Sequence, residues 1–405
     1  MLTFWKHIRS MAHKYTSEIV HLHSTMHSRI LLLTEHFPPH VGGVPRWLYN
    51  VYSRLEDYFV TILTGADNVI RCPNLEVISI PWPLRSWTLL SYRNWLAYSR
   101  LLYFTSQVYY HTHSSVIHAG RCIPEGFVCW MLNRIFGIPY LCYVHGEDIE
   151  IAWRCREYYH LVRPTLRQAA LLVANSRFTR DLLVNKWQVP SRRVRILHPG
   201  VDTHYFCPSH HRCERLMLTI ACPGRFQRRK GQDMLLRALA LVRKDIPNIR
   251  CILAGNGDDA HYLRKLANAL ALDGSIRWIS NPTDDQLLQL YRESDLVALP
   301  NREIDGDCEG FGIVLLEAQA CSKPILCGNS GGTKETLVPG RSGLVVDCTD
   351  PVNIAKAIIR FYKDKTRLAG MATFARRWVE RYFHWNVLIP KARVILRSLF
   401  KDYDR

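Results

Sequence analysis

Residues 218–231 read LTIACPGRFQRRKG, an apolar run that ends in a glycine turn rich in positive charge. The run at 218–222 has the length and composition of a buried β-strand. The same order occurs near the start of the chain, where residues 30–34 (ILLLT) lead to Gly42 and Gly43. This repetition predicts two similar halves, each of which opens with a strand followed by a glycine-bearing turn.

Short apolar runs alternate with segments of helical period in both halves, a pattern typical of parallel sheets covered by helices. With 405 residues the chain also exceeds one ordinary core. We therefore predict an α/β protein with two Rossmann-like domains that face each other across a cleft. The predicted strands are 30–34, 60–64, 116–119, 140–145 and 171–174 in the first half, and 218–222, 249–254, 276–279, 296–300 and 325–327 in the second.

Changes of composition suggest where the domains begin and end. Residues 1–28 contain five histidines and no apolar stretch of signal-peptide length, so we expect an N-terminal extension that can be disordered. A polar stretch after His198-Pro199-Gly200 predicts a linker. The expected domains are then residues 29–200 and 201–384, followed by a final helix over 385–405 that packs back on the first domain.

The chain is basic, with 53 Lys and Arg against 35 Asp and Glu and a formal net charge of +18. This balance favours anionic partners such as nucleotide diphosphates, acidic glycolipids or a negatively charged membrane face. No nucleic-acid signature is present, so nucleic acid is not an expected partner. Thirteen cysteines without a Cys-x-x-Cys pair or a preceding secretory signal predict a cytoplasmic protein. No apolar run is long enough to span a membrane.

Residues 300–318, PNREIDGDCEGFGIVLLEA, contain the most specific motif. A strand leads into a polar loop, and a helix opens near Gly312. Gly310 and Gly312 allow close approach of a ligand to the backbone, and the free amides of the helix start favour a phosphate. Glu309 and Glu317 are expected to point to the same mouth, where carboxylates accept hydrogen bonds from sugar and ribose hydroxyls. Alternatively, Glu317 solubilises an ordinary helix and Glu309 is a solvated loop residue.

The glycine turn after the first strand of the same half supplies two candidate cations, Arg225 and Lys230. Together they would clamp a diphosphate leaving group, whose charge develops in the transition state. A solvated basic turn is the alternative interpretation, and it fits Arg228 and Arg229 better.

The joint order of these motifs resembles the retaining glycosyltransferases of group 1, which have the twin-Rossmann GT-B fold. The resemblance covers most of residues 29–400 and rests on the Gly42-Gly43 loop, Gly224-Arg225 with Lys230-Gly231, the Glu309 and Glu317 pair, and Gly331-Gly332 before Glu335. It implies an enzyme of glycolipid or cell-surface polysaccharide synthesis that moves a sugar from a GDP- or UDP-sugar to a lipid-linked or saccharide acceptor, with retention at the anomeric carbon. It also implies that no metal or other cofactor is required, that residues 29–200 bind the acceptor and that residues 201–384 bind the nucleotide sugar.

The resemblance also implies roles for single residues. Arg225 and Lys230 would hold the diphosphate, Glu317 the ribose and Glu309 the donor sugar. In the segment His145-Gly146-Glu147-Asp148, His145 would lie beside the reacting carbon, although it is otherwise an ordinary loop histidine. The catalytic set is then His145, Arg225, Lys230 and Glu309, and the donor-binding set is Gly43, Arg225, Lys230, Gly310, Phe311, Gly312, Ile313 and Glu317. Within the family, the segments at 143–147 and 307–312 look most similar to phosphatidylinositol-type and exopolysaccharide mannosyltransferases.

Other functions remain open. A dehydrogenase is a rival for any Rossmann-like chain, but Gly255 and Gly257 lack the third glycine of a dinucleotide fingerprint. Asp305-Gly306-Asp307 has the Asp-x-Asp pattern of a metal site, although the Glu309 motif already explains this loop. A sugar epimerase or phosphorylase on the same fold, or a nucleotide-sugar-binding protein with a dead site, would share the scaffold.

Residues 80–110 contain no acidic residue and interleave basic and aromatic side chains. These are Arg85, Arg93, Arg100, Trp82, Trp87, Trp95 and several tyrosines. Tryptophan and tyrosine suit the headgroup region of a bilayer, and arginine favours an anionic surface. The stretch predicts reversible attachment to an anionic membrane. The alternative is that the aromatic residues fill the core between a helix and the sheet.

Overall fold

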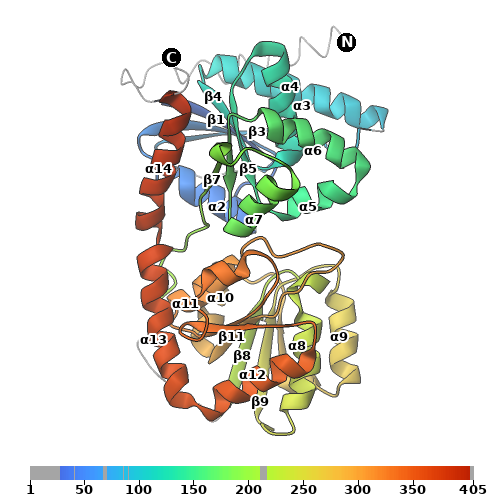
Figure 1. Cartoon of the computed structure of the whole chain (residues 1–405), viewed down its shortest axis with the longest axis vertical. Coiled ribbons are helices and arrows are strands. Elements are labelled where there is room, and N and C mark those ends of the chain that lie inside the picture. The colour runs from blue at the N-terminus through green and yellow to red at the C-terminus, as the bar shows by residue number, and fades with distance from the viewer. Residues whose placement is uncertain are drawn as a thin grey trace.

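A computed structural model describes residues 28–40, 42–66, 71–84, 86–89, 91–209 and 217–401 and contains one parallel sheet in each half of the chain (Figure 1). Of the predicted extension over residues 1–28, residues 1–27 lie outside the described residues and Ser28 begins the first strand; part of the predicted linker, 210–216, also lies outside them. No helix in the described part of the chain is both long and apolar enough to cross a bilayer.

The first sheet has the strand order β3-β2-β1-β4-β5-β6-β7. Its strands are β1 (Ser28–Thr34), β2 (Tyr58–Thr64), β3 (Leu75–Ser79), β4 (Val116–Ala119), β5 (Tyr140–Val144), β6 (Leu171–Ala174) and β7 (Val194–Ile196). The helices around it are α2 (Gly43–Tyr52), α3 (Tyr92–His111), α4 (Phe127–Phe136), α5 (Glu147–Arg154), α6 (Arg156–Gln168) and α7 (Arg177–Asp181). All of its strand pairs are parallel.

The second sheet has the order β10-β9-β8-β11-β12-β13 and is also parallel. Its strands are β8 (Leu218–Pro223), β9 (Ile249–Ala254), β10 (Ile276–Ile279), β11 (Leu296–Leu299), β12 (Ile325–Gly328) and β13 (Gly343–Val346). Its helices are α8 (Gln232–Val242), α9 (Ala260–Ala269), α10 (Asp284–Glu293), α11 (Ile313–Ala320), α12 (Pro351–Lys363) and α13 (Lys365–Tyr382). All ten predicted strands are present, with ends within two residues of the prediction, so the predicted α/β class is confirmed.

Both faces of the central strands are buried, which explains their unbroken apolar sequences. In β1, Leu31 and Leu33 belong to one core cluster, whereas Ile30 and Leu32 belong to the cluster on the other face. Because side chains alternate along a strand, a strand covered on both faces is apolar at every position.

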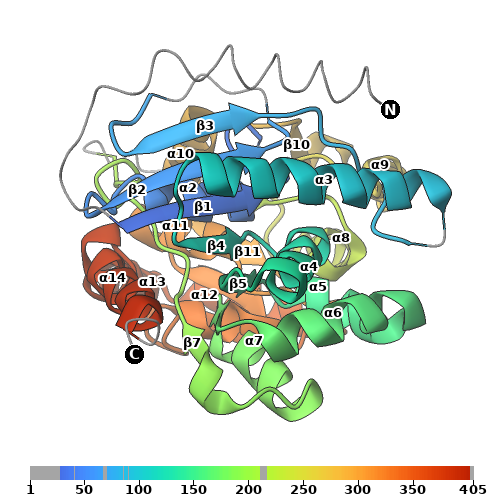
Figure 2. The ribbon, with the colours of Figure 1, turned by 90° about the horizontal axis from the view of Figure 1, so that it is seen from above.

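The last two helices connect the two domains along one flank of the molecule, where Figures 1 and 2 show α13 and α14 (Trp385–Lys401). The amide of Val201 donates to the Phe383 carbonyl at 2.9 Å, so the chain crosses between the domains twice at one place. Beyond this crossing, Trp385, Leu388 and Leu396 of α14 are buried in the core of the first domain.

Gly231 fixes the position of the charged turn after β8. Its φ is +76°, in the left-handed region, and a Cβ at this position would overlap the carbonyl oxygen of Pro300 at the end of β11. Glycine therefore allows the turn and the β11 loop to approach closely.

We predict that Gly231→Ala lowers the free energy of unfolding of the second domain by at least about 2 kcal/mol. The left-handed backbone alone costs roughly 1–2 kcal/mol for a residue with a Cβ, and the overlap with Pro300 adds to it. Thermal unfolding should then shift by roughly 4–8 °C relative to wild type. Gly274→Ala is the matched control, because a Cβ there meets open space. Equal melting temperatures for the two variants would contradict the prediction.

Candidate active site

The loops that follow the carboxyl ends of strands in the two sheets meet between the domains. Gly43, at the start of α2, faces Ile313 at the start of α11, and a Cβ on Gly43 would lie 3.9 Å from the Ile313 Cγ2. A Cβ on Gly310 would overlap the carbonyl oxygen of His145. The structure therefore brings the predicted residues of the first half to the loop that follows β11 in the second.

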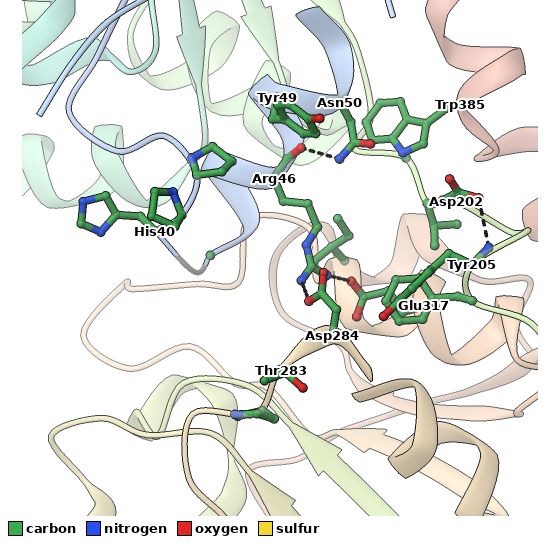
Figure 3. A pocket seen from close by; sticks show the side chains of 18 residues that line it. His40, Arg46, Tyr49, Asn50, Asp202, Tyr205, Thr283, Asp284, Glu317 and Trp385 are labelled. Atoms are coloured by element: carbon green, nitrogen blue, oxygen red, sulfur yellow. Dashed lines mark hydrogen bonds and ion pairs between the residues drawn. The ribbon is translucent and has the colours of Figure 1, made fainter. Parts of the chain in front are cut away.

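A cavity of about 500 Å³ lies between the two halves at this place (Figure 3). Its volume is in the range of small-molecule sites. The first half contributes a proline-rich loop and one face of α2, and the second half contributes the starts of α10 and α11. Residues of the cavity wall that carry polar side chains include His40, Arg46, Tyr49, Asn50, Asp202, Thr283, Asp284 and Glu317.

Glu317 is buried on α11, and both of its oxygens have a partner. Oε2 accepts a hydrogen bond from the Tyr291 hydroxyl at 2.6 Å, and Oε1 pairs with the Arg46 guanidinium of the first domain. Arg46 also contacts Asp284, so one arginine joins two carboxylates of the other domain. Burial raises the pKa of Glu317, and the nearby Arg46 guanidinium opposes this rise. We did not predict Arg46 as a site residue from the sequence. The one feature that could have indicated this role is its position one turn after Gly42-Gly43.

Glu309 is a second buried carboxylate, and it lies on two cations of the turn after β8. Lys230 Nζ is 2.5 Å and Arg229 Nη1 is 2.6 Å from the same oxygen, Oε2. Burial alone would raise the pKa of Glu309, but these two cations hold it below its usual value. The carboxylate is therefore charged at neutral pH.

Arg228 and Arg229 differ, although the sequence suggested that both are solvated. Arg228 is exposed, and its guanidinium lies 3.6 Å from the centre of the Tyr262 ring. For Arg229 the interpretation was wrong, because its side chain is only 6% exposed. The sequence shows that a residue is charged but does not show whether carboxylates surround it.

Arg225 lies at the exposed edge of the same turn. It forms no ion pair with any carboxylate of the described residues, whereas its neighbour Lys230 is already paired. Burial is the main cause of the low pKa of His36 in the first domain, about 4, and the positive charge of Arg225 adds a smaller lowering effect.

His145 follows β5, and its ring is fixed by the first domain. Nε2 donates to the Gly120 carbonyl at 2.7 Å, and the ring packs edge-on against Trp47 with 5.4 Å between ring centres. Burial lowers the pKa of His145, which favours the neutral ring at pH 7. The ring is thus anchored within the first domain, and its backbone carbonyl contacts Gly310 of the second.

The remaining predicted donor residues occupy the start of α11. Gly312 adopts φ +87° directly before the helix, and Ile313 lines the cavity. The Phe311 ring instead packs between His198 and Phe383, at ring-centre distances of 5.4 and 6.0 Å. Its side chain is buried in the core, so only its backbone is placed to meet a ligand.

In the Asp305-Gly306-Asp307 segment, the second carboxylate already has a cationic partner. Asp307 pairs with Arg229 at 3.0 Å, and burial raises its pKa to about 6. Within the described residues there is no group of three or more His, Cys, Asp or Glu side chains arranged to hold a metal ion.

Comparison with known protein families assigns both halves of the chain. The family model for glycosyl transferases group 1 matches residues 217–378, and that for Glycosyltransferase Family 4 matches residues 41–205. The chain belongs to the group 1 glycosyltransferases. The resemblance seen in the motifs is therefore confirmed.

Relatives of this glycosyltransferase span nearly the whole chain. It is 27% identical, over 92% of its length and 98% of the relative, to a GDP-mannose-dependent alpha-(1-6)-phosphatidylinositol monomannoside mannosyltransferase of Mycobacterium tuberculosis. It is 30% identical to a D-inositol 3-phosphate glycosyltransferase of Salinispora tropica, over 68% of this chain and 62% of the relative.

Solved structures share the fold of this glycosyltransferase. A sucrose-phosphate synthase from Thermosynechococcus elongatus superposes with a TM-score of 0.80 at 20% identity, covering 93% of this chain and 100% of that one. Anabaena HepE in complex with UDP and glucose gives 0.75 at 21% identity, with coverage of 92% and 100%. The predicted GT-B arrangement of two Rossmann-like domains is confirmed.

We predict that Arg46→Met lowers the free energy of unfolding by about 3 kcal/mol near pH 7.5, because it leaves the buried Glu317 without its cation. Arg54→Met is the matched control, since Arg54 forms a half-exposed pair with Asp202 at 3.4 Å, whose loss should cost only about 1 kcal/mol. Chemical denaturation measures both.

The pH dependence of this difference has a definite sign. Without Arg46 the pKa of Glu317 rises further above its unfolded value, so the ionised carboxylate destabilises the folded state. Protonation removes that penalty. The loss of unfolding free energy in Arg46→Met should therefore be largest at neutral and alkaline pH. It should become smaller as the pH falls through the raised pKa of Glu317. A loss of unfolding free energy that is equal for Arg46→Met and Arg54→Met, or that does not change with pH, would contradict the prediction.

Proposed function

We propose that this glycosyltransferase moves mannose from GDP-mannose to a lipid-linked acceptor of the phosphatidylinositol type, with retention at the anomeric carbon and without a metal ion. The observation that carries the proposal is a pair of buried carboxylates at the contacts between the domains: Glu317 lines the cavity, and Glu309 lies on the cationic turn whose Arg229 also contacts Glu147 of the first domain. The names of relatives that span almost the whole chain support GDP-mannose as the donor and a phosphatidylinositol mannoside as the acceptor.

In this proposal the charged residues of the second half hold the donor, and the first half contributes His145. Arg225, Lys230 and the start of α11 stabilise the diphosphate as the bond between it and the anomeric carbon breaks. Glu317 accepts hydrogen bonds from the ribose, and Glu309 accepts them from hydroxyls of the sugar. The acceptor oxygen bonds to the anomeric carbon on the face that the diphosphate leaves, and its proton passes to the departing phosphate oxygen. His145 lies beside the reacting carbon.

We predict that purified protein incubated with a nucleotide sugar and a phosphatidylinositol-type acceptor forms a glycoside whose anomeric configuration, read by NMR, equals that of the donor. The rate should persist in EDTA. A preceding screen with GDP, UDP and ADP should show stabilisation by the donor's nucleotide of about 2.7 kcal/mol at a concentration of 100 Kd.

Each part of this prediction can fail separately. Inverted product contradicts retention, and loss of activity in EDTA that manganese or magnesium restores contradicts metal independence. Epimerisation or phosphorolysis without glycoside formation favours the epimerase or phosphorylase alternative. Nucleotide binding without any turnover favours a dead site.

We further propose that the first domain attaches reversibly to the cytoplasmic face of an anionic membrane through α3. Tyr92 and Trp95 are 78% and 61% exposed on this helix, and Arg93 is exposed between them. Arg100 lies two turns further along. The exposed aromatic rings next to arginines suit an interface of headgroups and support the proposal.

Two tryptophans of the same stretch do not contribute to this surface. Trp82 and Trp87 pack against the core of the first domain, which is the alternative role that the sequence left open. Arg85 lies outside the described residues. The proposal therefore rests on α3 alone.

We predict that the protein co-sediments with vesicles containing anionic lipid, less strongly at high salt, and not with neutral vesicles. At about 1 kcal/mol for each arginine, Arg93→Gln with Arg100→Gln should reduce binding roughly 30-fold. Arg237→Gln with Lys265→Gln removes the same charge from exposed sites on the second domain and serves as the control. Equal loss in both double variants, or no binding by wild type, would contradict attachment through α3.

A further inference from the structure

Arg229 is a single buried guanidinium that contacts carboxylates from both halves of the chain. Nη1 lies 2.6 Å from Glu309 Oε2, and Nε lies 3.0 Å from Asp307 Oδ2. Nη2 reaches across the cleft and donates to Glu147 Oε2 at 2.9 Å. The first two carboxylates belong to the loop after β11, and the third opens α5 of the first domain.

The two cations on Glu309 are not equivalent. Lys230 and Arg229 both contact Oε2, so the other carboxylate oxygen, Oε1, is left to accept hydrogen bonds from a sugar. If Lys230 turns to the diphosphate of the donor, as the proposed function requires, it leaves Glu309. Arg229 then remains as the cation that keeps this buried carboxylate charged and in place.

The contact with Glu147 makes this arrangement depend on the position of the domains. Glu147 follows His145 by two residues, and Figure 1 shows α5 at the edge of the first domain that faces the second. When the domains separate, Glu147 moves away from Arg229 and the guanidinium loses one of its three carboxylates.

We propose that Arg229 is a positioning residue that orients Glu309 toward the donor sugar and ties this orientation to closure of the cleft through Glu147. The inference rests on the proposed function of Glu309. Arg228, the adjacent arginine of the same turn, is the matched control. It pairs with Asp233 and Asp259 and stacks on Tyr262, all of which belong to the second domain.

The charges around Glu309 give the proposal a pH signature. Arg229 and Lys230 lower the pKa of this carboxyl against the effect of burial. The carboxylates of Asp307 and Glu147 also contact Arg229, and their negative charges act in the opposite sense. Removal of Arg229 should therefore raise the pKa of Glu309, and the acid side of the rate profile should move to higher pH.

The experiment compares Arg229→Met, Arg229→Lys and Arg228→Met by steady-state kinetics across pH. For Arg229→Met we expect kcat to fall about 100-fold, as when a reacting group is misplaced by about 1 Å, with a smaller change in the donor KM and an acid limb at higher pH. Arg229→Lys should recover part of kcat. Arg228→Met should stay within roughly twofold of wild type, as is usual for surface substitutions. Kinetics of Arg229→Met equal to those of Arg228→Met would overturn the proposal.

A second measurement tests the link between domains without turnover. Small-angle scattering of the free protein should give a larger radius of gyration for Arg229→Met and Glu147→Gln than for Arg228→Met. In kinetics, adding Glu147→Gln to Arg229→Met should cost less than Glu147→Gln costs alone, because the two residues act through one contact. Equal radii, or additive losses of kcat, would overturn the coupling to closure. Absence of transfer by wild type would refute the proposed function and leave the scattering result to decide the link.

Discussion

The two carboxylates of the cleft are buried, and a buried carboxylate stays charged only if a cation or strong hydrogen-bond donors accompany it. Glu309 meets this need with two cations on one oxygen, and its pKa is lowered. Glu317 has one cation and a neutral phenol, and its pKa is raised. The partners of these two groups explain why polar side chains cross from one domain to the other at this place.

Several contacts between the domains are accordingly polar, as is common between domains that move relative to each other. Glu335 adds a third contact, since it accepts hydrogen bonds from the amides of Arg177 and Phe178 at the start of α7 and lies 3.0 Å from His198 Nε2. Glycine is required at position 331, before Glu335, because a Cβ there would overlap the backbone of Glu309. The segment 331–335 thus packs against the Glu309 loop and also contacts the first domain.

The fold was readable from the sequence wherever burial was complete. Nine of the ten predicted strands lie inside a sheet and are apolar at most positions, β10 is an edge strand, and all ten exist. The three missed strands, β3, β7 and β13, lie at the edges of the sheets: Glu76 interrupts the apolar run of β3, Arg195 interrupts that of β7, and β13 has only three apolar residues after Gly343. The candidate site was readable only in part. Glycines and acidic residues form a motif in one segment, but the partners of Arg46 and Arg229 lie far away in the sequence and become neighbours only through the packing of two domains.

The pairing of Arg46 with Glu317 sets a condition on donor binding under the proposed function. Both oxygens of Glu317 already have a partner, so a ribose that reaches this carboxylate competes with Arg46 for the same acceptor. The free energy of binding is then a difference between two hydrogen-bonded states, which is small compared with either one. Arg46 retains Asp284 at the rim of the cavity and is not left without a partner. The guanidinium that pairs with Glu317 therefore also limits how tightly the nucleoside is held, which suits a site that must release its nucleotide after each transfer.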